Sequence, residues 1–275
     1  MANETARLDA VLVARGAVGG REKAKELIAG GLVTVNGQTA TKPSMPISPT
    51  DVLTWDNSGQ RYVGRGGYKL ERALELAEIP VAGAVAMDVG ASTGGFTDCL
   101  LQHGARHVYA VDVGHDQLHP TLRANPAVTV LEGMDVRRTD ELRAALDEPP
   151  TVCTADVSFI SLTVVLPSIL QVLPKGAWLV CLIKPQFEAG RAAIGKNGVV
   201  KQPSAHKTVL RTVCEQFAAQ GCRLHALAPS PIRGGEGNAE YVSVWRYASD
   251  DASPPNMPDI DALVKEALGN KGADR

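Results

Sequence analysis

The sequence lacks the patterns that would mark a disulfide framework, a zinc site or a polycation. Its five cysteines form no C-x-x-C pair, its six histidines form no H-E-x-x-H motif, and its formal net charge is only −2. The cysteines are therefore expected to be buried thiols in a reducing cytoplasm. His115 and His119 have helical metal-ligand spacing without a third ligand nearby, so no metal site is expected. Any nucleic-acid binding must come from local basic patches.

A secretory signal and a membrane span are also missing. Residues 1–4 lead directly into a charged amphipathic segment, which is not how a signal peptide begins. One apolar stretch, residues 159–183, carries a single charge at Lys175 and is interrupted by Pro167 and Pro174. A membrane span needs about 20 uninterrupted apolar residues. The stretch is predicted to be a buried helix followed by a buried strand of a cytoplasmic protein without a membrane partner.

A glycine-rich segment is the most informative feature that is present. Residues 85–89 form an apolar run, three glycines follow, and residues 97–101 continue as a helical pattern that ends at Gly104. This order predicts strand, turn and helix, the first unit of a nucleotide-binding α/β sheet. Small residues let the backbone approach a ligand closely, and the helix N-terminus offers unpaired N–H groups. The turn residues predicted to contact the cofactor are Gly90, Ser92, Gly94, Gly95 and Phe96.

Acidic residues lie at or just beyond the ends of four successive apolar runs: Asp88, Asp112, Asp135 and Asp156. Ligands of open parallel sheets bind at the carboxyl edge of the strands, so all four are predicted to lie near the cofactor. A carboxylate at Asp88 favours S-adenosylmethionine, which carries an ammonium and a sulfonium, over the pyrophosphate of NAD. We expect Asp88 to bind the ammonium, Asp112 the ribose hydroxyls and Asp135 the adenine amino group.

The order of apolar patterns predicts two domains. Short amphipathic helices and a Val-Asn-Gly hairpin occupy about the first 58 residues, and residues 64–247 alternate strands with helices. The second part predicts a doubly wound, mainly parallel α/β sheet, closed at its edge by a hairpin of residues 224–228 and 241–247. The last segment is rich in Asp, Pro and Ser and is expected to be mobile, apart from a short helix at residues 260–268.

The first part resembles the small RNA-binding domain named after ribosomal protein S4, on residues 7–9, 21–28 and 31–37. Arg21 and Lys25 are one turn apart and are expected to bridge phosphates. A solvated helix face with intervening glutamates is the alternative. The residues predicted to bind RNA are Arg7, Arg15, Arg21, Lys23, Lys25, Arg61 and Arg65.

Four polar residues resemble, in their order and placing at strand ends, the Lys-Asp-Lys-Glu tetrad of FtsJ-type RNA 2′-O-methyltransferases: Lys69, Asp156, Lys184 and Glu240. Residues 5–247 as a whole resemble the TlyA (haemolysin A) family of ribosomal RNA methyltransferases. The resemblance implies an S-adenosylmethionine-dependent enzyme that methylates cytidine 2′-hydroxyls in small- and large-subunit rRNA. It implies rRNA or ribosomal subunits as partners, and we expect a monomer.

The resemblance also implies domain boundaries. Residues 1–59 are the S4-like RNA-binding domain, residues 60–67 a linker, residues 68–247 a Rossmann-like, FtsJ-like methyltransferase domain, and residues 248–275 an acidic tail. In the linker, Arg61 and Arg65 are expected to neutralise phosphates, and Tyr62 to stack on a base or dock the domains. Its glycines are expected to keep a hinge adjustable. A passive spacer is the alternative.

The residues themselves agree with this reaction. A ribose hydroxyl must lose its proton, and a lysine accepts one if burial and a neighbouring cation lower its pKa. Lys184 is the expected base, Lys69 the neighbouring cation, and Asp156 and Glu240 orient the two ammonium groups. Amino-group methylation is disfavoured because no proline follows Asp156. A membrane-acting haemolysin and a non-catalytic RNA-binding protein remain the alternative functions.

Overall fold

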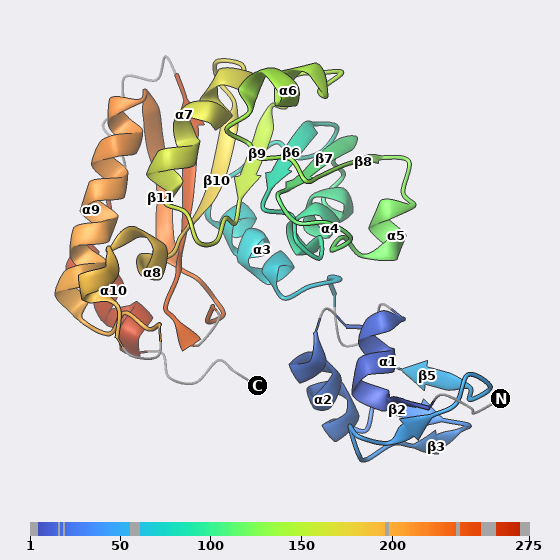
Figure 1. Cartoon of the computed structure of the whole chain (residues 1–275). Coiled ribbons are helices and arrows are strands. Elements are labelled where there is room, and N and C mark those ends of the chain that lie inside the picture. The colour runs from blue at the N-terminus through green and yellow to red at the C-terminus, as the bar shows by residue number, and fades with distance from the viewer. Residues whose placement is uncertain are drawn as a thin grey trace.

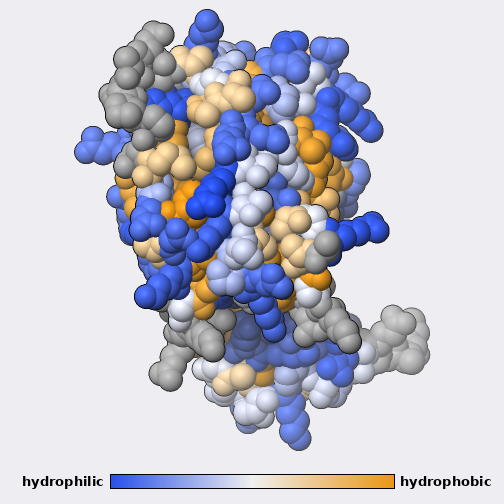
Figure 2. All heavy atoms as spheres, turned by 90° about the vertical axis from the view of Figure 1, so that its left-hand side faces the viewer, coloured by the Kyte–Doolittle hydropathy of each residue, from blue (hydrophilic) through white to orange (hydrophobic). Residues whose placement is uncertain are grey.

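The chain is described here by a computed structural model, which places residues 5–15, 17–18, 20–55, 61–195, 198–234, 237–248 and 257–269. It has a small N-terminal domain and a larger domain, connected by a segment that enters the first helix of the larger one (Figure 1). Figure 2 looks onto the side that carries α9 (Pro203–Ala219), where hydrophobic patches are scattered among hydrophilic residues. No helix in the described ranges is long and apolar enough to cross a membrane.

The small domain packs two helices against short strands. The helices are α1 (Leu8–Ala14) and α2 (Arg21–Ala29). A three-stranded sheet has the order β3 (Gln38–Thr39), β2 (Val33–Val35), β5 (Leu53–Trp55), and β1 (Ala6–Arg7) pairs with β4 (Pro46–Ile47). Asn36 and Gly37 have φ angles of 51° and 80°, so the predicted Asn-Gly turn joins β2 to β3. Both helices bury their apolar residues in one core with β2.

The larger domain is built on a seven-stranded sheet of order β11-β12-β10-β9-β6-β7-β8. Five strands are parallel, and β12 runs antiparallel to both β10 and β11. The strands are β6 (Val85–Val89), β7 (His107–Asp112), β8 (Val128–Glu132), β9 (Val152–Ala155), β10 (Trp178–Ile183), β11 (Cys222–Pro229) and β12 (Tyr241–Tyr247). The predicted doubly wound sheet with an edge hairpin is confirmed.

Helices cover both faces of this sheet. The helices are α3 (Gly66–Leu76), α4 (Gly95–Gln102), α5 (Pro120–Arg123), α6 (Thr139–Ala144), α7 (Leu162–Val172), α8 (Pro185–Glu188), α9 and α10 (Ile260–Gly269), with a 3-10 turn at Arg191–Ala193. Along β10, Leu179, Cys181 and Ile183 pack in the core with α7 and α9, whereas Val180 and Leu182 pack in the core with α3 and α4. This burial on both sides explains the uninterrupted apolar run of β10.

The predicted C-terminal helix is present as α10. Its residues Ile260, Leu263, Val264 and Ala267 pack into the larger core, so this part of the tail belongs to the larger domain. Residues 249–256 and 270–275 lie outside the described ranges, and the expectation of mobility falls on them. All five cysteines are buried free thiols, as predicted.

The segment before α3 is packed onto the larger domain. Tyr62 is 2% exposed in the core that α3 and α4 share, and the backbone N–H of Val63 donates to Asp98 at 2.8 Å. A Cβ on Gly67 would lie 2.3 Å from the ring of Tyr62. The glycine therefore allows close packing, and the predicted adjustable hinge is wrong for this segment. Burial also excludes Tyr62 from stacking on a base.

Candidate active site

Parallel strands bring three of the four predicted catalytic residues to one edge of the sheet. Asp156 follows β9 and Lys184 follows β10, so both lie at the carboxyl edge. Glu240 precedes β12, which runs in the opposite direction and pairs Tyr241 with Ile183. The start of β12 therefore lies beside the end of β10, and Glu240 comes next to Lys184.

Lys69 completes the cluster from the buried side of α3. Its Nζ lies 2.6 Å from Glu240 Oε2 and 3.8 Å from Asp156 Oδ2. Lys184 Nζ lies 2.5 Å from Asp156 Oδ1 and donates to Ser158 Oγ at 3.0 Å. Each lysine side chain is 9% exposed. Asp156 thus lies between two nearly buried ammonium groups, and the structure brings all four predicted residues together.

The two carboxylates determine the charge of Lys69. Burial lowers the pKa of Lys69, but the charges of Asp156 and Glu240 and the hydrogen bond to Glu240 outweigh it and raise the pKa above its usual value. Lys69 is therefore a fixed cation at neutral pH.

A cavity of about 640 Å³ lies along the ends of β6, β7 and β9, within the range of small-molecule sites. Gly90, Ser92, Asp112, Asp135 and Asp156 line it. The carboxylate of Asp112 accepts the N–H of Ser92 at 2.8 Å and the N–H of Gly114 at 2.7 Å. The carboxylate of Asp135 is held by Arg137, at 2.6 Å between Oδ2 and Nη2. These residues lie where the sequence predicts a cofactor site.

Asp88 does not line this cavity, contrary to the prediction. It is 0% exposed and accepts hydrogen bonds from the hydroxyls of Thr97 at 2.7 Å and Thr154 at 2.8 Å. Burial is the largest influence and raises the pKa of Asp88 to about 6. Because Asp88 lies opposite Thr154 in the register of β6 and β9, its side chain points into the fold. The argument that placed Asp88 against the cofactor's ammonium is therefore wrong.

The remaining turn residues divide into two groups. Gly95 and Phe96 line a second cavity of about 200 Å³ rather than the first. Gly94 has a φ of 95°, and a Cβ there would lie 2.3 Å from Leu122, so its role is in the turn and its packing. The two cavities share Gly90, Ser92 and Asp156 in their linings. The cluster therefore meets both cavities through Asp156, and Lys69 also lines the smaller one.

Two matched parts of the chain agree with the fold. An FtsJ-like methyltransferase profile matches residues 62–247, and an S4 domain profile matches residues 6–53. The chain is 42% identical to the 16S/23S rRNA (cytidine-2′-O)-methyltransferase TlyA of Mycobacterium tuberculosis, over 90% of this chain and 92% of that protein. This chain belongs to the TlyA family. The predicted family is thereby confirmed.

Other members of the TlyA family carry different names. Hemolysin A of Brachyspira hyodysenteriae is 39% identical over 86% of this chain and 98% of that protein. A solved structure described as a hemolysin of Streptococcus thermophilus has a TM-score of 0.76 and 39% identity, covering 98% of this chain and 97% of that chain.

Within the described ranges, no group of three or more His, Cys, Asp or Glu residues is arranged to hold a metal ion.

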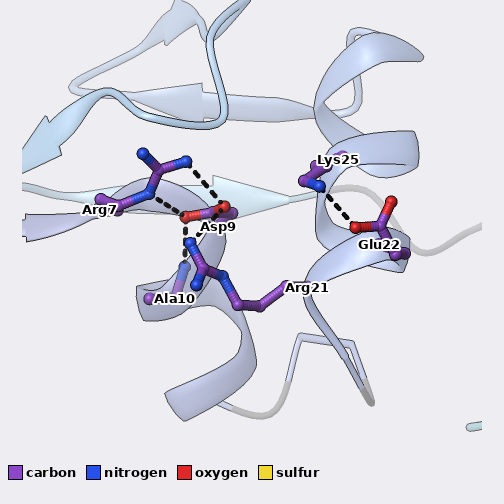
Figure 3. Close-up of polar contacts among 6 residues, drawn as sticks. All are labelled: Arg7, Asp9, Ala10, Arg21, Glu22 and Lys25. Atoms are coloured by element: carbon purple, nitrogen blue, oxygen red, sulfur yellow. Dashed lines mark hydrogen bonds and ion pairs between the residues drawn. The ribbon is translucent and has the colours of Figure 1, made fainter.

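The predicted RNA-binding cations of the S4 domain are arranged differently from the prediction. Arg7 and Arg21 both contact the buried carboxylate of Asp9, at 3.1 and 3.0 Å, whereas Lys25 contacts Glu22 at 2.5 Å (Figure 3). Arg21 and Lys25 lie one turn apart on α2, as predicted, but they contact different carboxylates, and their bridging of phosphates stays a prediction. The two partners lie on different helices: Asp9, twelve residues before Arg21, is on α1, whereas Glu22 is on α2 with Lys25.

Three of the other four predicted cations have separate surroundings. Arg15 is exposed at the end of α1, and Arg61 forms an ion pair with Glu71 on α3. Arg65 is exposed and lines the second cavity. The positions of these residues at the surface agree with the prediction, and their contact with RNA stays a prediction.

One aromatic residue was not assigned a role from sequence. Phe159 is 92% exposed and has a φ of 63°, and its ring lies 5.1 Å from that of Phe187. Glu188 fixes the residues that follow Phe159, because its carboxylate accepts hydrogen bonds from the hydroxyl of Ser161 at 2.5 Å and from the N–H of Leu162 at 2.7 Å. A large exposed aromatic ring beside the first cavity is suited to contact a nucleobase. Only the Ser-Phe pair directly after Asp156 and Val157 signals this in the sequence.

Proposed function

We propose that this chain transfers a methyl group from S-adenosylmethionine to the 2′-hydroxyl of cytidines in small- and large-subunit rRNA. The observation that carries the proposal is the cluster of Lys69, Asp156, Lys184 and Glu240, whose central carboxylate, Asp156, lines both cavities. The larger cavity has room for a cofactor, and the smaller has room for part of a nucleotide. The TlyA relative of Mycobacterium tuberculosis is named for this reaction.

The donor set of the larger cavity fits the cofactor. Asp112 is held in place by two backbone N–H groups, and its carboxylate can accept further hydrogen bonds from a ribose. Asp135 lies on the same wall and is available to an adenine amino group, although Arg137 already contacts both of its oxygens. Acidic side chains also suit a cationic ligand. When bound, S-adenosylmethionine supplies an electrophilic methyl group.

The lysines have different tasks in this proposal. The ribose oxygen forms the new bond to the methyl carbon as the bond to sulfur breaks, and its proton passes to Lys184, which enters this step as the neutral amine and leaves it as an ammonium. Lys69 remains a cation beside the reacting oxygen, since Glu240 holds its ammonium group. Asp156 contacts both lysines and so sets their mutual position. Positioning of this kind lowers the barrier of an in-line displacement.

Phe159 provides a surface for the target base. Its exposed ring lies at the mouth of the larger cavity, three residues after Asp156. Stacking of a splayed-out base on an aromatic ring is a common way to bind single-stranded RNA. The proposed pose places the cytosine against Phe159 and its ribose at Lys184.

The experiment is nucleoside analysis of rRNA after incubation with cofactor labelled in its methyl group. Small and large ribosomal subunits from cells that lack this protein are tested separately. The proposal expects labelled 2′-O-methylcytidine with the natural chain and none with Lys184→Ala. Label in a base, or in a different nucleoside, would contradict the proposal.

A further inference from the structure

The smaller cavity is lined by both domains. Lys23, on helix α2 of the S4 domain, lines this cavity of about 200 Å³ together with Arg65 and Lys69 of the larger domain. Asp156 closes the same cavity on the catalytic side. The RNA-binding domain therefore contributes a side chain to the pocket that contains the tetrad, in addition to whatever surface it offers elsewhere.

Lys23 and Arg65 differ from the other S4 and linker cations in their partners. Arg7 and Arg21 contact Asp9, Lys25 contacts Glu22, and Arg61 contacts Glu71. Within the part of the chain that the structure places, neither Lys23 nor Arg65 forms an ion pair.

The two cations also act on each other. Burial, and then the charge of Arg65, lower the pKa of Lys23, and these effects exceed the opposite influence of Glu26. Arg65 also acts to lower the pKa of Lys69. Like charges that converge in a partly buried space destabilise one another, and an anion between them removes that cost.

The charge of the cavity shows which kind of ligand fits it. Four cationic side chains line it, namely Lys23, Arg65, Lys69 and Arg233, against the single carboxylate of Asp156. Lys69 is matched by Glu240 and Asp156, whereas Lys23 of the S4 domain and Arg65 before α3 add positive charge that these carboxylates do not contact. A phosphodiester has one negative charge and is the anion that an RNA substrate brings next to every ribose.

We propose that Lys23 and Arg65 together bind the phosphate that flanks the target nucleotide, so that the S4 domain forms part of the catalytic pocket. This inference rests on the proposed function and names how its substrate is held. A phosphate fixed between the two domains places the adjoining ribose against Lys184 and Lys69. Lys23 is thus a positioning residue for the reaction, and its loss lowers the rate of methyl transfer more than the affinity for rRNA.

The test measures single-turnover methylation with saturating ribosomal subunits, and subunit affinity by filter binding. Lys23→Ala is expected to reduce the rate about tenfold or more, as expected for the loss of one charge-assisted hydrogen bond, with less than threefold change in affinity. Lys23→Arg should retain most of the rate. Lys175→Ala, the same charge change at the opposite edge of the sheet, serves as the matched control. Thermal unfolding verifies that each variant is folded.

A double-mutant cycle tests the shared phosphate. If Lys23 and Arg65 hold one anion, Lys23→Ala combined with Arg65→Ala should slow the reaction little more than the stronger single variant. Independent, multiplicative losses would overturn the proposal. A Lys23→Ala enzyme with the natural rate but weakened subunit affinity would also overturn it, because Lys23 would then be only a surface contact.

A second measurement separates this inference from the proposed function. Protein saturated with S-adenosylhomocysteine is titrated with cytidine, cytidine 3′-monophosphate and cytidine 5′-monophosphate. One monophosphate should bind more tightly than cytidine, and Lys23→Ala should abolish that difference. If the natural chain methylates no rRNA but shows this phosphate dependence, the proposed function fails and the anion site stands. Equal binding of all three ligands would contradict the site itself.

Discussion

Two aspartates, one in each domain, hold a pair of cations in opposite ways. Asp9 is fully buried, while its partners Arg7 and Arg21 have side chains that are 51% and 55% exposed. Asp156 is 19% exposed in its side chain, while its partners Lys69 and Lys184 are only 9% exposed. The first arrangement directs fixed positive charge toward solvent. The second keeps its lysines away from solvent, beside a carboxylate that lines both cavities.

The difference follows from the two kinds of cation. A guanidinium stays protonated and presents donors in a planar fork, which suits recognition of a phosphate at a surface. An ammonium group can lose its proton when its surroundings favour the neutral form, which suits chemistry in a partly buried site. Under the proposed function, the two domains use a shared carboxylate for different purposes, binding in one and proton transfer in the other.

The largest expected effect comes from the nearly buried pair of lysines that contact Asp156, Lys69 and Lys184. Lys184→Ala should lower methyl transfer by about 10²–10⁴-fold, because it removes a general base. Titration calorimetry should show cofactor affinity within a few-fold of the natural chain, since Lys184 does not line the cofactor cavity. Lys184→Arg keeps the cation but not the base. A fully active arginine variant would show that this residue does not accept the proton.

Asp112 sharpens the comparison because backbone N–H groups, rather than cations, hold its carboxylate. Asp112→Ala should weaken binding of S-adenosylmethionine by about 10- to 150-fold, the loss of one charge-assisted hydrogen bond of roughly 1.5–3 kcal/mol. Calorimetry gives the affinity directly. Asp88→Asn is the matched control, because Asp88 is buried and does not face the cavity. A larger loss in the Asp88 variant would contradict the placement of both residues.

Asp9→Asn tests the exposed pair of arginines that contact Asp9, Arg7 and Arg21. The variant gains positive charge, yet binding of ribosomal subunits should weaken by about tenfold, because Arg7 and Arg21 lose the group that orders their side chains. Filter binding at several salt concentrations measures the affinity. Cofactor affinity should stay the same, and thermal unfolding checks the fold. Tighter binding would show that charge, rather than orientation, governs this surface.

The smallest effect is on stability and concerns a third carboxylate, Glu132. Burial opposes its ionisation, but Arg123 and the N–H groups of residues 116–118 outweigh burial and lower the pKa of Glu132 to about 2. Because the folded pKa is depressed, its stabilisation is present above about pH 4.5 and is lost as the pH falls toward 2. Glu132→Gln should cost about 3 kcal/mol or less at pH 7. Urea unfolding should show a difference from the natural chain that shrinks below pH 4; a constant difference would be contrary evidence.

The sequence predicted the parts of the molecule that depend on local pattern. Apolar runs that end in an acid located β6 to β9, and the placement of Asp112 and Asp135 on one cavity followed from the parallel sheet. Asp88 also ends an apolar run, but the direction of its side chain depends on contacts with Thr154 on the neighbouring strand β9 and with Thr97 on the next helix, α4. No local rule contains those contacts.

Longer-range contacts explain the other differences. Arg21 contacts Asp9 because of how α1 packs against α2, which sequence spacing alone does not give, whereas Lys25 contacts Glu22 one turn away on the same helix. Lys23, predicted only as one of the RNA-binding cations, lines the smaller cavity together with Lys69 and Asp156. Its position depends on how the S4 domain sits against the larger domain. That arrangement could be seen only in the folded chain.

The central claim is that the buried pair on Asp156 carries out the chemistry. Its most direct test is mass spectrometry of nucleosides from ribosomal subunits incubated with S-adenosylmethionine and either the natural chain or Asp156→Asn. Asparagine keeps the shape of the side chain but removes the charge that contacts Lys69 and Lys184. We predict 2′-O-methylcytidine with the natural chain and at least about a hundredfold less with the variant. Equal amounts of 2′-O-methylcytidine from both proteins would contradict the account.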